Sequence, residues 1–127
     1  MAKDVIRTDA APAPFQGAPY NQAVRAGNLV FVAGQIGLAP GGGALEGDIV
    51  AQTEQALANV RAILEAAGSS LDNLLKTTVF LQSFDDFAAM NEVYARHVGA
   101  NPPARSTVEV SKLPSGALVE IEAVAVV

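Results

Sequence analysis

Two segments of this 127-residue chain place apolar residues at helical spacing, and each lies between short runs rich in β-branched and aromatic residues. The first segment follows Asp48, a good helix N-cap, and stops before Gly68, where a C-terminal glycine is common. The second segment follows Ser83, stops at Gly99 and cannot continue through Pro102. Strand–helix–strand units favour right-handed crossovers between parallel neighbours, so this order constrains the chain to an α/β architecture.

The strands expected around these helices complete one sheet. They cover residues 5–7, 21–26, 28–36, 76–81, 106–110 and 117–127. Half of the residues are hydrophobic and 17% are charged, which is enough apolar material for a packed core. We therefore expect a single α/β (α+β) domain over residues 1–127, with a mixed six-stranded sheet and two helices on one face. The last two strands are expected to pair as an antiparallel hairpin.

Composition excludes several classes of function. The net charge is −5 at pH 7 and the basic residues are scattered, so the chain is poorly suited to nucleic acid or to an anionic membrane surface. Without cysteine it has no disulfide, catalytic thiolate or Cys-based metal site. His97, the single histidine, lies near a helix C-terminus and is expected to stabilise the helix dipole. No segment reads as a leader or a membrane span, which predicts a cytoplasmic protein.

Two acidic residues stand out in the last strand. Glu120 and Glu122 are two positions apart and therefore point to the same face of the sheet. If residues 106–110 pair with this strand as a hairpin, Arg105 and Thr107 join them on that face. An arginine fork grips a carboxylate and a glutamate moves protons, which together suit hydrolysis of a small acid bearing a C=N bond. A structural Arg–Glu cross-strand ion pair explains the same pattern.

Three further features are less informative on their own. Tyr20 is either a packing residue or the wall of a binding site. Gly34, within an apolar strand, marks either a close approach of backbone to a ligand or a bulge. Glycines 41–43 lack the lysine of a phosphate-binding loop and indicate a flexible turn.

Several blocks of the sequence are typical of one protein family. They are APYNQAV (18–24), GNLVFVAGQI (27–36), LEAAGSSLDNLLKTTVFL (64–81), PPARSTVEV (102–110) and LPSGALVEIEAVAV (113–126). The chain resembles the Rid family of enamine/imine deaminases, specifically the RidA subgroup, also labelled endoribonuclease L-PSP or translation inhibitor. The resemblance covers nearly the whole chain, and the combination of PPARS with EIEA is its most specific part.

The resemblance implies a chorismate-mutase-like fold and a homotrimer with sites in clefts between subunits. It also implies the hydrolysis of 2-aminoacrylate and related 2-imino acids to 2-keto acids and ammonia, without cofactor or metal. By resemblance, Arg105 binds the substrate carboxylate, and Glu120 orients water or transfers protons. Tyr20, Gly34 and Asn91 match positions that line the family's site.

The chain departs from the family pattern at three positions. Thr107, also expected at the substrate site, stands where many members carry cysteine. Ala18 and Ala33 replace a common glycine and serine, which leaves the preferred imino acid open. Two other functions remain as alternatives: a non-catalytic trimer that binds small carboxylates such as keto acids, and an RNA-cleaving translation inhibitor.

Overall fold

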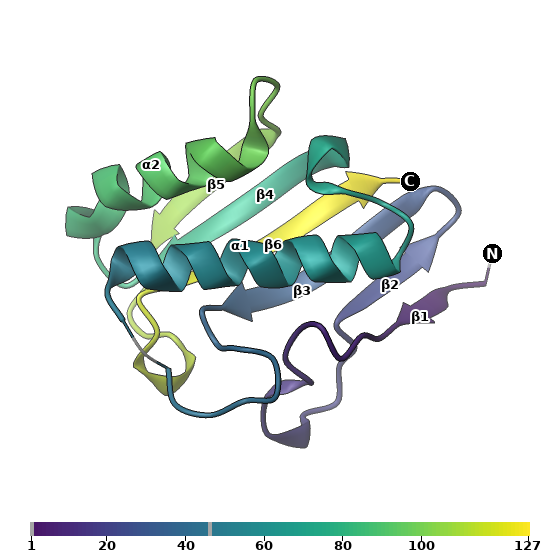
Figure 1. Cartoon of the computed structure of the whole chain (residues 1–127), viewed down its shortest axis with the longest axis horizontal. Coiled ribbons are helices and arrows are strands. Elements are labelled where there is room, and N and C mark those ends of the chain that lie inside the picture. Colours follow the sequence, from purple (N-terminus) through teal and green to yellow (C-terminus); the bar gives the residue numbers. More distant parts are fainter. Residues whose placement is uncertain (1, 46) are drawn as a thin grey trace.

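The computed structural model describes residues 2–45 and 47–127, and within them the chain forms one sheet and two long helices (Figure 1). The helices are α1 (Ile49–Ala66) and α2 (Phe87–Val98). The strands are β1 (Asp4–Ile6), β2 (Ala23–Ala26), β3 (Leu29–Ile36), β4 (Leu74–Leu81), β5 (Ala104–Glu109) and β6 (Val119–Val126). Their order across the sheet is β1-β2-β3-β6-β4-β5.

The sheet is mixed. β4 and β5 run parallel and are joined through α2, whereas the other neighbouring strands pair antiparallel. Both helices cover the same face of the sheet, with α1 crossing β3 and β6 and with α2 beside it (Figure 1). The expected six-stranded sheet with two helices on one face is confirmed, and β2 and β3 form an antiparallel hairpin.

The pairing expected for the last two strands is wrong. β5 pairs with β4, and β6 lies on the other side of β4, between β4 and β3. This central place buries one whole side of β6, where Val119 and Ile121 are fully inaccessible to solvent. A hairpin would have left that apolar row at an edge, so burial of the row favours the central position.

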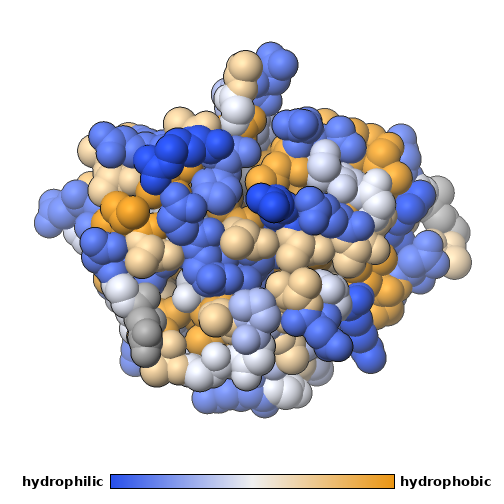
Figure 2. Space-filling view, viewed as in Figure 1, coloured by the Kyte–Doolittle hydropathy of each residue, from blue (hydrophilic) through white to orange (hydrophobic). Residues whose placement is uncertain are grey.

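Each helix is bounded by the residues that the sequence indicates. The Asp48 carboxylate accepts a hydrogen bond from Ala51 N at 3.0 Å, and Gly68 takes a positive φ of 83° just after α1. Ser83 caps a short 3-10 turn that leads into α2, and Gly99 ends α2 with a φ of 71°. Hydrophilic side chains gather over the outer surfaces of both helices (Figure 2).

The core lies between the helices and the sheet. Its fully buried side chains come from both layers; the largest are Leu57, Ile63, Leu64, Leu81, Met90 and Ile121. The opposite face of the sheet carries no helix among the described residues, and Phe31 and Val108 on it are 44% and 40% exposed. In the part of the chain that the structure describes, no helix is long and apolar enough to span a membrane.

Candidate functional site

The strand β6 places Glu120 on the face of the sheet that the helices do not cover. Val119 and Ile121 point into the core, so Glu120 between them points the other way. Its register partners are Ile36 on β3 and Phe80 on β4. The carboxyl group is thus carried by a central strand that is hydrogen-bonded on both sides, which fixes its position.

Gly34 makes room for this carboxyl group. The pairing of β3 with β6 is irregular between Val32 and Gln35, and Gly34 lies within that irregular stretch. A Cβ atom on Gly34 would come within 2.9 Å of Glu120 Cδ and 3.0 Å of Glu120 Oε2. Of the two sequence interpretations of Gly34, the bulge is confirmed by the irregular pairing, and the close neighbour of Gly34 within the chain is the Glu120 side chain.

Burial raises the pKa of Glu120, and the negative charge of Glu122 raises it further. Both causes act against ionisation, because a carboxylate loses hydration in a partly buried site and is repelled by a second carboxylate. A carboxyl group with a raised pKa exchanges protons more readily near neutral pH than an ordinary glutamate does.

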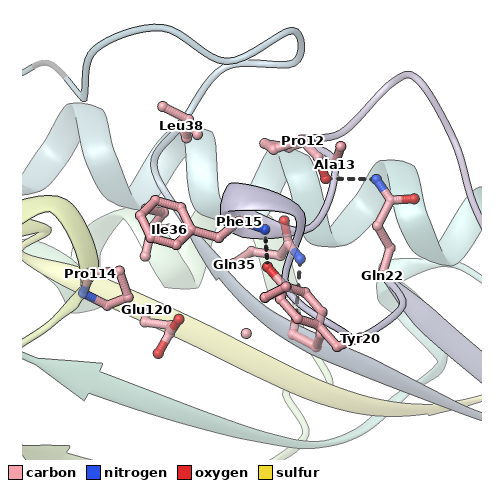
Figure 3. A pocket seen from close by; sticks show the side chains of 13 residues that line it. Pro12, Ala13, Phe15, Tyr20, Gln22, Gln35, Ile36, Leu38, Pro114 and Glu120 are labelled. Carbon is pink, nitrogen blue, oxygen red and sulfur yellow. Dashed lines mark hydrogen bonds between the residues drawn. The ribbon is translucent and has the colours of Figure 1, made fainter.

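Glu120, Gly34 and Tyr20 border one cavity of about 340 Å³ (Figure 3). Tyr20 reaches it from the segment before β2, and its hydroxyl accepts a hydrogen bond from Phe15 N at 2.6 Å. The remaining lining is mostly apolar, and Figure 3 shows Phe15 extending from its turn toward Ile36. Cavities of this size and character are typical sites for small molecules.

Arg105 lies elsewhere, on β5, beneath α2. Its guanidinium carbon is 4.8 Å from the ring centroid of Tyr94 and 5.8 Å from that of Phe87. The Tyr94 hydroxyl shares a buried 2.7 Å hydrogen bond with the Thr77 hydroxyl, and burial raises the pKa of Tyr94. Aromatic faces stabilise a guanidinium without neutralising it, so Arg105 remains available to an anion.

Asn91 borders the same groove as Arg105, as the resemblance implies. Its Oδ1 atom is buried and has no hydrogen-bond partner within the described chain. Buried polar atoms normally have a partner, so this oxygen is an exception among the buried polar atoms of the described chain.

The polar cluster predicted from a β5–β6 hairpin does not form within one chain. Through β4, Arg105 aligns with Thr77 and then Ala123, while Thr107 aligns with Val79 and then Ile121. These rows face the helices, whereas Glu120 and Glu122 face the opposite side of the sheet. The error follows from the insertion of β4, and it also removes the structural Arg105–Glu ion pair as an explanation.

The sequence does not indicate the residues that surround the Arg105 guanidinium and the Glu120 cavity. Thr77 lies in the expected strand 76–81 and Tyr94 in the expected second helix, and nothing in their local pattern shows that they meet beside Arg105. Phe15, in a Pro- and Gly-rich segment, gave no periodic signal, although a large aromatic residue there is unusual.

His97 is structural. Its Nε2 atom lies 2.7 Å from the carboxylate of Glu54 on α1, and Arg96 contacts the other oxygen of that carboxylate at 2.9 Å. Over residues 2–45 and 47–127, no group of three or more His, Cys, Asp or Glu side chains is arranged to hold a metal ion.

The mixed sheet, the partly buried Glu120 and the half-buried Arg105 can be compared with known proteins. The model of the family described as endoribonuclease L-PSP matches residues 8–127, so the chain belongs to that family, which includes the Rid and RutC proteins. A RutC family protein of Pyrococcus horikoshii is 54% identical over 97% of this chain and 97% of its own length.

Other relatives have more specific names. The 2-iminobutanoate/2-iminopropanoate deaminase of Mus musculus is 43% identical over 99% of this chain and 93% of its own length. The chloroplastic Reactive Intermediate Deaminase A of Arabidopsis thaliana is 44% identical over 98% of this chain and 66% of its own length. The family therefore contains enzymes named as imine deaminases.

Solved structures agree with the fold. RidA from an Antarctic Psychrobacter has a TM-score of 0.92 at 42% identity, covering 98% of this chain and 99% of its own. TdcF of E. coli, solved with bound serine, has a TM-score of 0.91 at 41% identity, covering 98% of each chain.

Proposed function

We propose that this protein hydrolyses reactive 2-imino acids and their enamine tautomers, such as 2-aminoacrylate, to 2-keto acids and ammonia. The observation that carries the proposal is the partly buried Glu120 carboxyl, with its raised pKa, bordering a small, mostly apolar cavity. The names of the mouse and Arabidopsis relatives support the same reaction class.

The chemistry requires only water and a group that moves protons. Water adds to the carbon of the C=N bond while the Glu120 carboxylate accepts a proton from the water and passes it to the imine nitrogen, which gives a carbinolamine. The carbinolamine collapses when Glu120 takes the proton of its hydroxyl group and delivers it to the nitrogen, which leaves as ammonia while the C=O bond forms. One water is consumed and one ammonia is released, and positioning supplies much of the acceleration because the imine is already electrophilic.

Arg105 is proposed to bind the substrate carboxylate with two parallel hydrogen bonds. Arg105 and Glu120 face opposite sides of one sheet, so a single subunit does not offer both to one small molecule. We propose that the protein is a homotrimer in which the Arg105 of one subunit borders the Glu120 cavity of the next. Exposed apolar side chains on the uncovered sheet face, including Phe31 and Val108, support such association.

The other site residues then fall into two groups. Tyr20 and Gly34 act with Glu120, since they border its cavity. Asn91 and Thr107 act from the side of Arg105, since Asn91 borders the same groove as Arg105. Thr107 shares a strand face with Arg105.

A coupled assay tests the function. An amino-acid oxidase generates the imino acid, and the rate of 2-keto acid formation is followed with wild type, Arg105→Ala and Glu120→Gln. Matched controls are Arg61→Ala and Glu65→Gln, which change the same residue types in an exposed ion pair on α1. We expect acceleration by wild type and both controls, and loss of at least about 100-fold in the two site variants.

Two results would count against the proposal. If folded wild-type protein accelerates the hydrolysis of no imino acid, the proposed catalytic function is wrong. Cleavage of RNA by wild type, unchanged in Arg105→Ala, would move the assignment to the activity that the family description names.

A further inference from the structure

The Glu120 cavity has one long apolar wall. It is formed by Pro12, Phe15, Ala33, Ile36, Leu38 and Pro114. In Figure 3 Pro114 and Ile36 lie near the Glu120 carboxyl, whereas Leu38 and Pro12 lie at the far border of the cavity. A three-carbon imino acid occupies only a small part of a cavity of about 340 Å³, so most of this wall lies beyond the reacting atoms.

Two amide side chains that border the cavity, those of Gln22 and Gln35, donate hydrogen bonds within the chain. Gln22 donates to the carbonyls of Thr8, Ala11 and Pro12, and its oxygen accepts from Thr8 N at 2.7 Å. Gln35 donates to the Ala33 carbonyl. Because the NH2 groups of these amides donate to backbone carbonyls and not into the cavity, a ligand meets a mainly apolar wall.

Phe15 holds a fixed place in this wall. Its backbone N–H donates to the Tyr20 hydroxyl at 2.6 Å, and the next residue, Gln16, takes a positive φ of 53°. Non-glycine residues seldom adopt that conformation, so the turn is specified by its contacts and directs the Phe15 ring toward Ile36.

We propose that this wall receives the side chain of the substrate, and that the protein prefers 2-imino acids with apolar side chains the size of leucine's or larger over 2-aminoacrylate. The assignment rests on the proposed deaminase function. The C=N carbon lies beside Glu120 at one end of the cavity, and the alkyl or aryl group extends from that carbon along Phe15 and Leu38. Each additional buried methylene then increases the affinity about fourfold.

The experiment compares imino acids derived from alanine, leucine and phenylalanine at equal rates of supply. Wild type, Phe15→Ala and Leu38→Ala are tested, with Val50→Ala as a control that removes an exposed apolar side chain on α1. Binding of the corresponding 2-keto acids is measured by calorimetry on the same proteins, because binding needs no turnover. Thermal unfolding establishes that each variant is folded.

We expect wild type and Val50→Ala to favour the leucine-derived acid over the alanine-derived one by at least about tenfold, in rate and in binding. Phe15→Ala and Leu38→Ala should each reduce that ratio about threefold or more. A wild-type ratio near one, or a ratio that neither wall variant changes, overturns the inference. If no imino acid is accelerated but the keto acids keep the expected order of affinity, the side-chain site stands and the deaminase function fails.

Discussion

Arg105 and Glu120 face opposite sides of the same sheet, on strands β5 and β6 that flank β4. The guanidinium lies beneath α2, and the carboxyl lies on the face without helices. A reaction that needs both groups on one small molecule therefore needs two copies of the chain.

Mixing of two inactive variants tests this arrangement. Arg105→Ala and Glu120→Gln are unfolded together in equal amounts and refolded, so that the proposed trimers would form with mixed composition. Each site draws one residue from each of two subunits, so about a quarter of the sites should regain both, with about a quarter of wild-type activity. Either variant refolded alone serves as the control, and a mixture no more active than these would refute a shared site.

Tyr94 should position Arg105 rather than react. Replacing Tyr94 with Leu removes the ring 4.8 Å from the guanidinium and should raise KM about 5- to 30-fold, with a smaller change in kcat. Tyr94→Phe keeps the ring, loses only the hydrogen bond to Thr77 and should change KM about threefold or less. Steady-state kinetics separates the two, and equal effects of both variants would show that the hydroxyl, not the ring, matters.

Gly34→Ala should impair activity far more than stability. Its new Cβ would meet the Glu120 carboxyl at about 3 Å, so the carboxyl has to move and activity should fall at least about tenfold. Gly43→Ala is the control: nothing lies within 4 Å, but its φ of 104° strains alanine. It should lose about 1 kcal/mol of stability and keep its activity. Denaturant unfolding and the coupled assay together distinguish the two effects.

The raised pKa of Glu120 has consequences for pH dependence. The folded protein binds this proton more tightly than the unfolded chain, so the group costs stability as pH rises from about 4.5, the ordinary pKa of a glutamate, through the raised pKa of the folded protein. Glu120→Gln should therefore be more stable than wild type at neutral pH. Glu122→Gln removes one cause of the shift and should move the acid limb of the activity profile to lower pH. An acid limb unmoved by Glu122→Gln would exclude Glu120 as the group that titrates.

His97→Gln should reduce stability without affecting the reaction. The Glu54 carboxylate, whose pKa is lowered by hydrogen bonds from His97 and Arg96, loses one partner. Its contribution is present above pH 4.5 and is lost as pH falls through the lowered pKa. We expect a loss of about 0.5–1 kcal/mol at pH 7, since the Glu54 side chain is 41% exposed. A loss of deaminase activity in the folded variant would contradict the structural role.

Local structure could be predicted from the sequence because caps and periodicity act within a few residues. Asp48 and Gly68 bound α1 as expected, and alternation along β6 correctly separates Glu120 from Ile121. These features need no knowledge of distant neighbours.

The relative placement of Arg105 and Glu120 could not be predicted in the same way. Alternation gives the face of each strand, but only strand order relates the face of Arg105 to that of Glu120, and β4 comes between them. The wall residues Phe15 and Leu38 lie in irregular segments, where positions depend on single side-chain contacts rather than on a repeating pattern.

The residues that border the Glu120 cavity come from two kinds of backbone, the central strands β3 and β6 and irregular segments outside the sheet. Glu120 belongs to β6, which is hydrogen-bonded on both sides, whereas Leu38 and Phe15 lie outside the strands. Each of these two residues is held by a few local hydrogen bonds, from Asn59 and to Ile36 for Leu38, and with Tyr20 and Ala18 for Phe15. Under the proposed function, substitutions in these two segments change which molecules enter the cavity without displacing Glu120. Related proteins would then diverge in substrate range by loop substitution alone and keep the same reaction.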